Sequence, residues 1–297
     1  MTLRISMTRL VAAATIGFGP VVLAMPATAQ AIDAGDYVPA PDGTQLGLVY
    51  LQYANAGALY RDGKKVDDDA ELESAISILR YVGFTKIGGM TFDYQVLQPF
   101  GHLAGGGSTK SLGKTTGFGD TILVGTLWLH EDAEHQSYFG VTPYLFLPTG
   151  DYRASRALNL GENRWKGSLQ AVYSKGFGKH FIAELSGDVM IYGNNDDAGA
   201  ASDDLTQKAT VRIQGFARFP LDARNELNAR IMHVTGGETK INGIEQNNVT
   251  RTTSLLGTWR HNFTPKWQIM TQVGADVAVR NGFKEGVRGQ IRLLRVF

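Results

Sequence analysis

The chain has no cysteine among its 297 residues, which excludes disulfide bridges, thiolate metal sites and cysteine nucleophiles. It also lacks an excess of charge of either sign, because 29 Lys and Arg residues are balanced by 28 Asp and Glu residues. A nearly neutral chain gives no reason to expect a nucleic acid as partner. Beyond the amino terminus, no apolar run approaches the roughly 20 residues that a membrane helix needs.

The amino-terminal segment has the three parts of a secretory signal peptide. Two arginines precede an apolar run over residues 10–24, and the small residues of PATAQA follow. A charged start, an apolar middle and an Ala-x-Ala end are typical of a segment cleaved during export. A membrane anchor is the alternative, but glycine and proline interrupt the run. We predict a signal peptide at residues 1–31, a polar periplasmic lead at residues 32–43 and a single domain at residues 44–297.

Apolar residues are nevertheless abundant, at 43% of the sequence, together with 36 glycines. In the closing segment EGVRGQIRLLRVF, Ile291 and Phe297 fall on one face of a period-two pattern, and Gln290 and Arg292 fall on the other. This alternation is typical of a strand between two different environments. Arg295 shares the apolar face, and we expect its long side chain to reach the headgroup region of a membrane. A soluble edge strand is the alternative.

Alternating segments follow one another along the whole domain, and their connections alternate between long and short except for a shortened last loop. We predict strands at 44–54, 71–82, 87–100, 120–130, 137–148, 164–175, 181–192, 204–219, 224–234, 249–263, 267–279 and 285–297. A barrel with both chain ends in the periplasm has an even strand number, long outer loops and short inner turns. The predicted fold is all-β, a closed antiparallel transmembrane β-barrel of 12 strands. In a soluble β-sandwich, loop length has no reason to follow hairpin parity.

Charged residues occupy the polar side of many predicted strands. Because Arg or Lys facing lipid near the midplane costs about 2–4 kcal/mol, we predict that this side lines the lumen. Inward aromatic residues could stack against an aromatic solute, although core filling explains them as well. Twelve strands allow either a narrow pore or a packed interior. The predicted lumen-lining residues are Asp93, Gln95, Tyr144, Phe146, Glu184, Asp188, Tyr192, Lys208, Arg212, Glu226, Arg230, Asp276, Arg288 and Arg292.

Several motifs in order suggest a family. GFGD, LPTGDY and NLGxNxW, the earlier segment VDDDAELESAISILRYVGFTKIGGMTFDYQVLQPF and the closing EGVRGQIRLLRVF resemble the outer-membrane transporter family associated with the meta pathway of phenol degradation. The resemblance spans nearly the whole mature chain. It implies a location in the bacterial outer membrane and passive uptake of small hydrophobic or aromatic compounds. It also implies contact with outer-membrane lipid and lipopolysaccharide, and insertion by the barrel-assembly machinery through the carboxyl-terminal strand.

Three other interpretations are open. A surface adhesion or scaffolding barrel would have a plugged lumen. An outer-wall lipid hydrolase would need a nucleophile and base such as Ser137 and His135, but no single strand supplies the full set of groups. Acidic loop residues such as Asp67 could bridge through divalent cations to lipopolysaccharide phosphates, although simple solvation explains them better. We therefore predict a protein that is not an enzyme, with no cofactor and no metal site.

Overall fold

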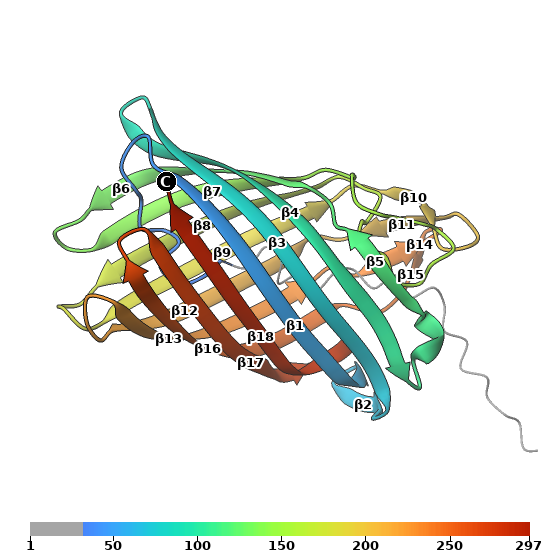
Figure 1. The fold of residues 1–297 in the computed structure, drawn as a ribbon. Helices are drawn as coiled ribbons and strands as arrows, with labels where there is room; N and C mark the ends of the chain where they lie inside the picture. Colours follow the sequence, from blue (N-terminus) through green and yellow to red (C-terminus); the bar gives the residue numbers. More distant parts are fainter. Residues whose placement is uncertain (1–31) are drawn as a thin grey trace, which may run out of the picture.

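A computed structural model describes residues 32–297; the predicted signal peptide at residues 1–31 lies outside the described residues. The described chain forms a closed antiparallel β-barrel of 12 strands, which confirms the predicted fold (Figure 1). In chain order, the wall strands are β1 (Gln45–Arg61), β3 (Ala70–Ile87), β4 (Met90–Gly107), β6 (Ile122–Asp132), β7 (Ser137–Phe146), β8 (Lys166–Gly176), β9 (Ile182–Tyr192), β12 (Thr210–Pro220), β13 (Asn225–Gly236), β16 (Thr250–Thr264), β17 (Trp267–Val279) and β18 (Gly282–Val296).

The barrel closes where the last strand meets the first. β18 runs antiparallel to β1, with Leu294 opposite Leu48. The backbone N–H of Phe297 adds a hydrogen bond of 3.0 Å to the carbonyl oxygen of Gln45. Closure gives the first and last strands a partner, and this is needed because hydrocarbon offers no hydrogen bonds to an open edge.

Long connections gather at one end of the barrel, here called the outer end, and short turns at the other, the inner end. The outer end carries β2 (Lys64–Asp67), η2 (Lys110–Leu112), β5 (Lys114–Phe118), β10 (Asn195–Ala198), β11 (Asp203–Gln207), β14 (Thr239–Ile241) and β15 (Ile244–Glu245). The last four form a separate sheet in the order β10-β11-β14-β15 (Figure 1). The predicted rhythm of long and short connections is therefore correct.

The hairpin of β3 and β4 is longer than predicted. Residues 101–107, which their glycines mark as a loop, continue β4 and pair with residues 70–76 of β3. The turn between these strands lies at Gly88 and Gly89, whose φ angles of 60° and 86° favour glycine. The glycines of residues 101–107 led the prediction to end this strand too early. A paired neighbouring strand can hold a glycine-rich segment extended.

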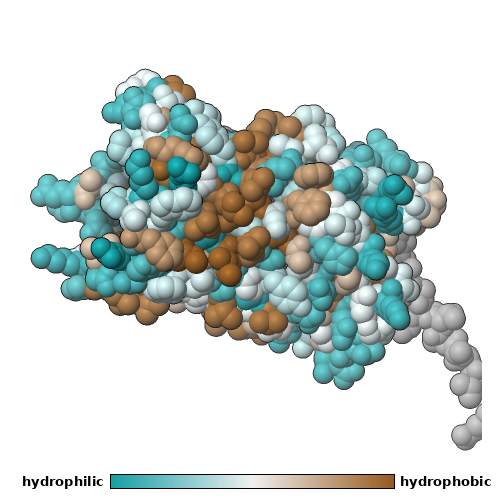
Figure 2. All heavy atoms as spheres, viewed as in Figure 1, coloured by the Kyte–Doolittle hydropathy of each residue, from teal (hydrophilic) through white to brown (hydrophobic). Residues whose placement is uncertain are grey.

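The outer surface of the wall is apolar in its middle. Figure 2 shows a brown band between two mainly hydrophilic ends. Exposed side chains of this kind include Leu51, Leu79, Leu169, Leu185 and Val273, and they alternate along their strands with buried residues. This surface suits the hydrocarbon core of a membrane. Within residues 32–297, no helix is long and apolar enough to cross a bilayer.

Arg295 lies on the outward side of β18, as the period-two pattern predicts. Its guanidinium carbon is 5.3 Å from the ring centre of Trp267 and 4.9 Å from that of Phe297. Stacking on two aromatic rings stabilises a cation at the edge of the membrane, where a bare charge would be costly.

Residues 32–43, predicted as a polar periplasmic lead, begin inside the barrel. Ile32, Asp33, Ala34 and Tyr37 are at most 5% exposed, whereas residues 41–43 are exposed. The polar composition of this segment suggested solvent, but its acidic and hydroxyl groups find hydrogen-bond partners on the inner wall, as described below. We call residues 32–43 the plug.

Lys208 was assigned to the lumen, and the structure corrects this. The residue lies between β11 and β12 in the outer loops, where its side chain is 55% exposed and its Nζ is 2.6 Å from a carboxylate oxygen of Glu238. The wall strand begins only at Thr210, so strand parity does not extend back to Lys208.

Candidate solute pathway through the barrel lumen

The inner wall has an apolar half and a charged half. β1, β3, β4, β6 and β7 supply the apolar half, whose side chains are all buried: Leu48, Tyr50, Ile76, Ile78, Val82, Phe84, Leu97, Leu103, Ile122, Val124, Trp128, Tyr138 and Phe146. Most of this half escaped the sequence analysis, which took polar character as the mark of the lumen. The signal was present in β3, where apolar residues occupy both sides of the strand, because one side faces lipid and the other faces this half.

The charged half is formed mainly by β9, β12, β13, β17 and β18. Arg212 Nε lies 2.7 Å from Asp188, and Arg218 is 2.6 Å from Glu184 and 2.9 Å from Glu226. The structure thus brings together predicted lumen residues as ion pairs between neighbouring strands. Buried ion pairs of this kind fix the wall geometry, because loss of one partner leaves a desolvated charge.

The remaining predicted residues divide by position. Asp93, Gln95 and Phe146 are buried on the inward sides of β4 and β7. Tyr144 and Tyr192 are partly exposed; Tyr144 donates a 3.0 Å hydrogen bond to Gln170. The guanidinium of Arg288 lies 3.4 Å from Asp276, while Arg230 and Arg292 contact the plug. Arg218, also inward and charged, was not in the predicted set although the parity of its strand would have included it.

The plug occupies the space between the two halves. Asp36 is 2.8 Å from Arg292 Nη1 and 3.2 Å from Arg80 Nη1, so one carboxylate joins β18 to β3. The hydroxyl of Tyr37 bonds to Thr142, and its carbonyl oxygen accepts a 3.1 Å hydrogen bond from Trp128 Nε1. These contacts join the plug to different sides of the barrel, so the plug spans the lumen.

The carboxyl of Asp36 is held in its charged form and the hydroxyl of Tyr37 in its neutral form. Burial opposes ionisation of Asp36, but Arg292 and Arg80 outweigh it and hold the pKa of this carboxyl below its usual value. Burial raises the pKa of the Tyr37 hydroxyl well above its usual value, so this group stays a neutral hydrogen-bond donor. The plug is thus anchored by ionic contacts on one side and by neutral hydrogen bonds on the other.

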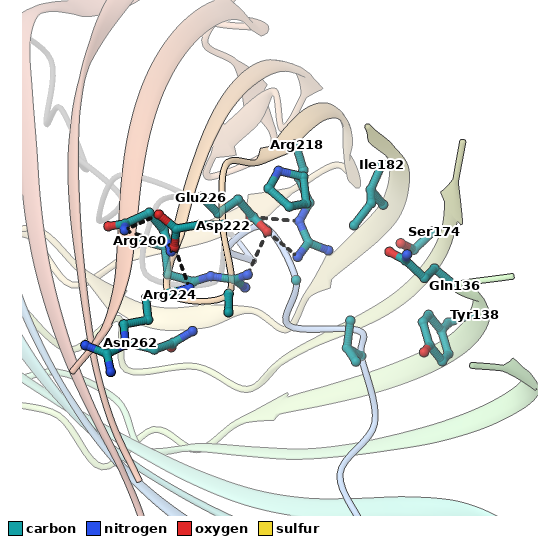
Figure 3. Close-up of a pocket in the computed structure, with 15 residues that line it drawn as sticks. Gln136, Tyr138, Ser174, Ile182, Arg218, Asp222, Arg224, Glu226, Arg260 and Asn262 are labelled. Atoms are coloured by element: carbon teal, nitrogen blue, oxygen red, sulfur yellow. Dashed lines mark hydrogen bonds and ion pairs between the residues drawn. The ribbon is translucent and has the colours of Figure 1, made fainter. Parts of the chain in front are cut away.

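A pocket of about 290 Å³ opens on the inner side of the plug. In Figure 3, Arg218 and Arg260 point toward Glu226, and Asp222 and Arg224 approach from the turn between β12 and β13. Arg260 Nη2 lies 2.6 Å from Glu226. Five charged side chains line this pocket: Arg218, Asp222, Arg224, Glu226 and Arg260.

At the outer end, the loop between β7 and β8 folds over the mouth. Glu162 accepts a 2.6 Å hydrogen bond from Arg164 Nη2 and also pairs with Lys166. Arg164 in turn donates to Gln207 of β11 at 2.6 Å. This cluster links the loop to the wall and to the outer sheet.

The cluster predicts a pH dependence. Burial disfavours the Glu162 carboxylate, but Lys166 and Arg164 outweigh burial and lower its pKa from 4.5 to about 2. A pKa depressed on folding gives stability that is full above 4.5 and is lost as the pH falls toward 2, about 3 kcal/mol at most. We expect hydrogen–deuterium exchange at residues 147–165, corrected for the intrinsic rate, to rise over this window. Glu162→Gln should show fast exchange at every pH; equal protection of the wild type at pH 5 and pH 2 would contradict this.

Ser137 and His135, the groups considered for an outer-wall hydrolase, do not bond to each other. His135 Nδ1 binds Asp132 at 2.7 Å, whereas Ser137 contacts a different histidine, His130, at 3.1 Å. Ser137 is only 3% exposed. Among the described residues, no carboxylate bonds to His130, and no group of three or more His, Cys, Asp or Glu residues could hold a metal ion. A nucleophile needs access and an oriented base.

The family model described as "Putative MetA-pathway of phenol degradation" matches residues 57–293, which is most of the chain. No curated protein sequence matches the chain significantly.

Three solved structures are also similar to this chain. The crystal structure of an outer membrane channel from Pseudomonas putida F1 is similar over 90% of this chain and 100% of that chain, with 38% identity and a TM-score of 0.88. The β domain of the Bordetella autotransporter Brka has 9% identity and a TM-score of 0.53 over 86% of this chain and 100% of that chain. The translocator domain of NalP from Neisseria meningitidis has 11% identity and a TM-score of 0.52, covering 88% and 91%. The last two share the barrel fold alone.

Proposed function

Because the chain belongs to the family of the MetA pathway of phenol degradation, we propose that this outer-membrane barrel is a channel for passive uptake of small hydrophobic or aromatic compounds. The observation that carries the proposal is the apolar half of the inner wall, which extends over β1, β3, β4, β6 and β7. The similar Pseudomonas putida F1 protein is itself an outer membrane channel.

The pathway would use the boundary between the two halves. An apolar solute gains by contact with side chains such as Ile78 and Trp128, both at most 2% exposed to solvent. The facing charged half keeps the rest of the lumen polar and allows water to enter with the solute. Weak contacts on both sides let a solute bind and leave again, as passive conduction requires. The plug must move, at least in part, for passage.

Uptake of 1-N-phenylnaphthylamine, a hydrophobic aromatic dye that lipopolysaccharide excludes, tests the proposal. Cells with the protein in the outer membrane should take up the dye faster than cells with an empty vector. Ile78→Asn should slow uptake by about ten-fold, because an amide in the apolar half loses the apolar contact and adds a desolvation cost. Ser186→Asn, a matched change on the charged half, should have little effect. Equal uptake with and without the protein would end the proposal.

A second candidate is a surface adhesion or scaffolding barrel, because the lumen is in fact occupied by the plug. The anchoring contacts argue against a permanent seal, since they are mostly ionic and hydrogen-bonded and can be exchanged for water. The two functions separate experimentally: removal of the outer sheet, residues 195–207 and 239–245, would abolish adhesion but leave dye uptake. Loss of dye uptake on this trimming would speak against a pathway confined to the lumen.

We also propose two contacts outside the lumen. The acidic residues Asp196 and Asp203 of the outer loops support contact with lipopolysaccharide headgroups, in which divalent cations would bridge carboxylate and phosphate. Phe297 follows the carboxyl-terminal strand β18 and is 61% exposed, and this exposed aromatic end supports recognition by the barrel-assembly machinery. Binding of a β18 peptide to that machinery, with Phe297→Ala as the weakened variant, tests the second contact.

A further inference from the structure

The wall contains a set of donors arranged around one carboxylate of the plug. Gln272 of β17 donates a 2.7 Å hydrogen bond to Asp33 Oδ1. Arg292 of β18 lies 3.1 Å from Asp33 Oδ2, and Gln290 of the same strand is 3.3 Å from both oxygens. Two amides and a guanidinium thus form a receptor whose geometry suits any carboxylate. All three donors belong to the wall, whereas the carboxylate belongs to the plug.

One buried cation beside this receptor lacks a carboxylate partner. Arg230 of β13 is 6% exposed, and its Nη1 donates to the carbonyl oxygen of Ile32 at 3.1 Å. Its Nε has no hydrogen-bond partner. Among the described residues, no carboxylate lies within ion-pair distance of Arg230. A buried guanidinium with no carboxylate in direct contact favours binding of an anion.

The ion pairs around the plug support the same conclusion. Arg80, Arg230 and Arg292 face the plug, whose carboxylates in contact with the wall are Asp33 and Asp36; its third carboxylate, Asp42, is exposed. The other nearby cations have partners on the wall itself: Arg212 pairs with Asp188, and Arg288 pairs with Asp276 and Glu285. The plug carboxylates therefore lie within ion-pair distance of Arg80 and Arg292 but not of Arg230.

Space for an anion lies next to Arg230. A cavity of about 30 Å³ is lined by Asp33, Arg230 and Gln290 on its polar side and by Ile76 and Leu256 on its apolar side. This volume holds one or two waters or a single carboxylate group. An aromatic ring would need the plug to withdraw.

Gly274 of β17 leaves room for the side chain of Leu256 beside this cavity. The strand registers place Leu256 opposite Arg230, Gly274 opposite Leu256, and Arg288 opposite Gly274. A Cβ on Gly274 would lie 2.6 Å from Leu256 Cδ1 and 2.3 Å from the carbonyl oxygen of Leu255. A side chain there would push Leu256 toward the cavity.

We propose that Gln272, Gln290, Arg292 and Arg230 form a binding site for the carboxylate of an amphiphilic solute, and that Asp33 of the plug occupies this site as an internal substitute. A solute carboxylate first meets Arg230 and then exchanges with Asp33 on Arg292. The exchange conserves charge at the receptor and releases the plug, so that anionic aromatic solutes open their own path. This inference rests on the proposed channel function and names its preferred solutes as carboxylates.

The test reads plug release directly. The chain has no cysteine, so Ala34→Cys gives a single thiol at a plug position that is 2% exposed. Purified protein in liposomes is treated with a water-soluble maleimide in the presence of benzoate or of benzamide, which has the same shape without the charge. Benzoate should accelerate labelling in proportion to its concentration, and benzamide should not. Equal acceleration by both, or by neither, would overturn the proposal.

Substitutions in the same background assign the site. Arg230→Gln should raise the benzoate concentration needed for half-maximal acceleration by about ten-fold, the effect of losing one charged hydrogen bond. Arg230→Lys keeps the charge, and its half-maximal benzoate concentration should lie between that of the parent and that of Arg230→Gln. Arg295→Gln, on the outward side of β18, should respond like the parent; a response lost equally in all three would mean that benzoate acts elsewhere. Benzoate-dependent labelling without dye uptake would refute the channel alone, and dye uptake without benzoate-dependent labelling would refute the carboxylate site alone.

Discussion

Deletion of residues 32–43 is expected to raise the flux of small solutes through the barrel in liposomes by about ten-fold or more. A state separated from the major one by a few kcal/mol is populated at about 0.1–10%, and flux through the open state scales with that fraction. Without the plug, the open lumen becomes the only state. The measurement is the rate of liposome swelling, with single-channel conductance as a second readout.

The barrel should survive this deletion. Its closure depends on the pairing of β1 with β18, which begins at Leu46, and water can enter the vacated lumen to solvate Arg80 and Arg292. Asp42→Asn is the matched control, because Asp42 belongs to the plug segment but is exposed; its flux should match that of the wild type. If the deletion variant is folded, as shown by its heat-dependent gel mobility, and its flux is unchanged, the plug does not limit passage.

The second large effect concerns stability. Glu226 is 2% exposed and accepts hydrogen bonds of 2.9 Å from both Nε and Nη2 of Arg218 and of 2.6 Å from Arg260. Glu226→Gln removes the charge that two guanidiniums share and leaves Arg260 without a carboxylate. Breaking a buried ion pair by loss of one partner costs about 3–5 kcal/mol. We expect a fall of this size in the free energy of unfolding, measured by urea titration in liposomes and followed by tryptophan fluorescence.

An exposed ion pair supplies the comparison. Lys208 and Glu238 form a pair in the outer loops, and the lysine side chain is 55% exposed. Lys208→Gln should leave the unfolding curve unchanged, because solvent screens such pairs. A similar loss of stability in both variants would show that the buried network around Glu226 has no special role and that charge itself stabilises the barrel.

The parity of the strands predicted most of the wall correctly. The inward positions of Glu184, Asp188 and Arg212 follow from alternation, since successive side chains of a strand point to opposite sides. Parity failed at Lys208, because it holds only within a continuous strand and the chain leaves the wall before Thr210. Parity also did not identify most of the apolar half, since apolar residues such as Ile78 look alike whether they face lipid or a lumen.

The plug could not be predicted from composition. Residues 32–43 are polar and contain Asp33, Asp36 and Asp42, and such a segment is usually solvated. Its place in the lumen depends on Arg80 and Arg292, which lie far along the chain and become neighbours only when the barrel closes. A surplus of inward arginines on strands such as β18 was a faint signal that carboxylates from elsewhere would be needed.

The sequence alone determined that the chain makes a closed sheet in the outer membrane. Alternation with a period of two, an even strand number and the rhythm of its loops are local properties, and the need to satisfy every backbone hydrogen bond in lipid leaves closure as their one outcome. The tertiary structure decided what fills the barrel and which carboxylate each guanidinium meets. Some of those contacts join residues more than 200 positions apart, such as Asp33 and Arg292, and only the curvature and register of the complete wall set their distances.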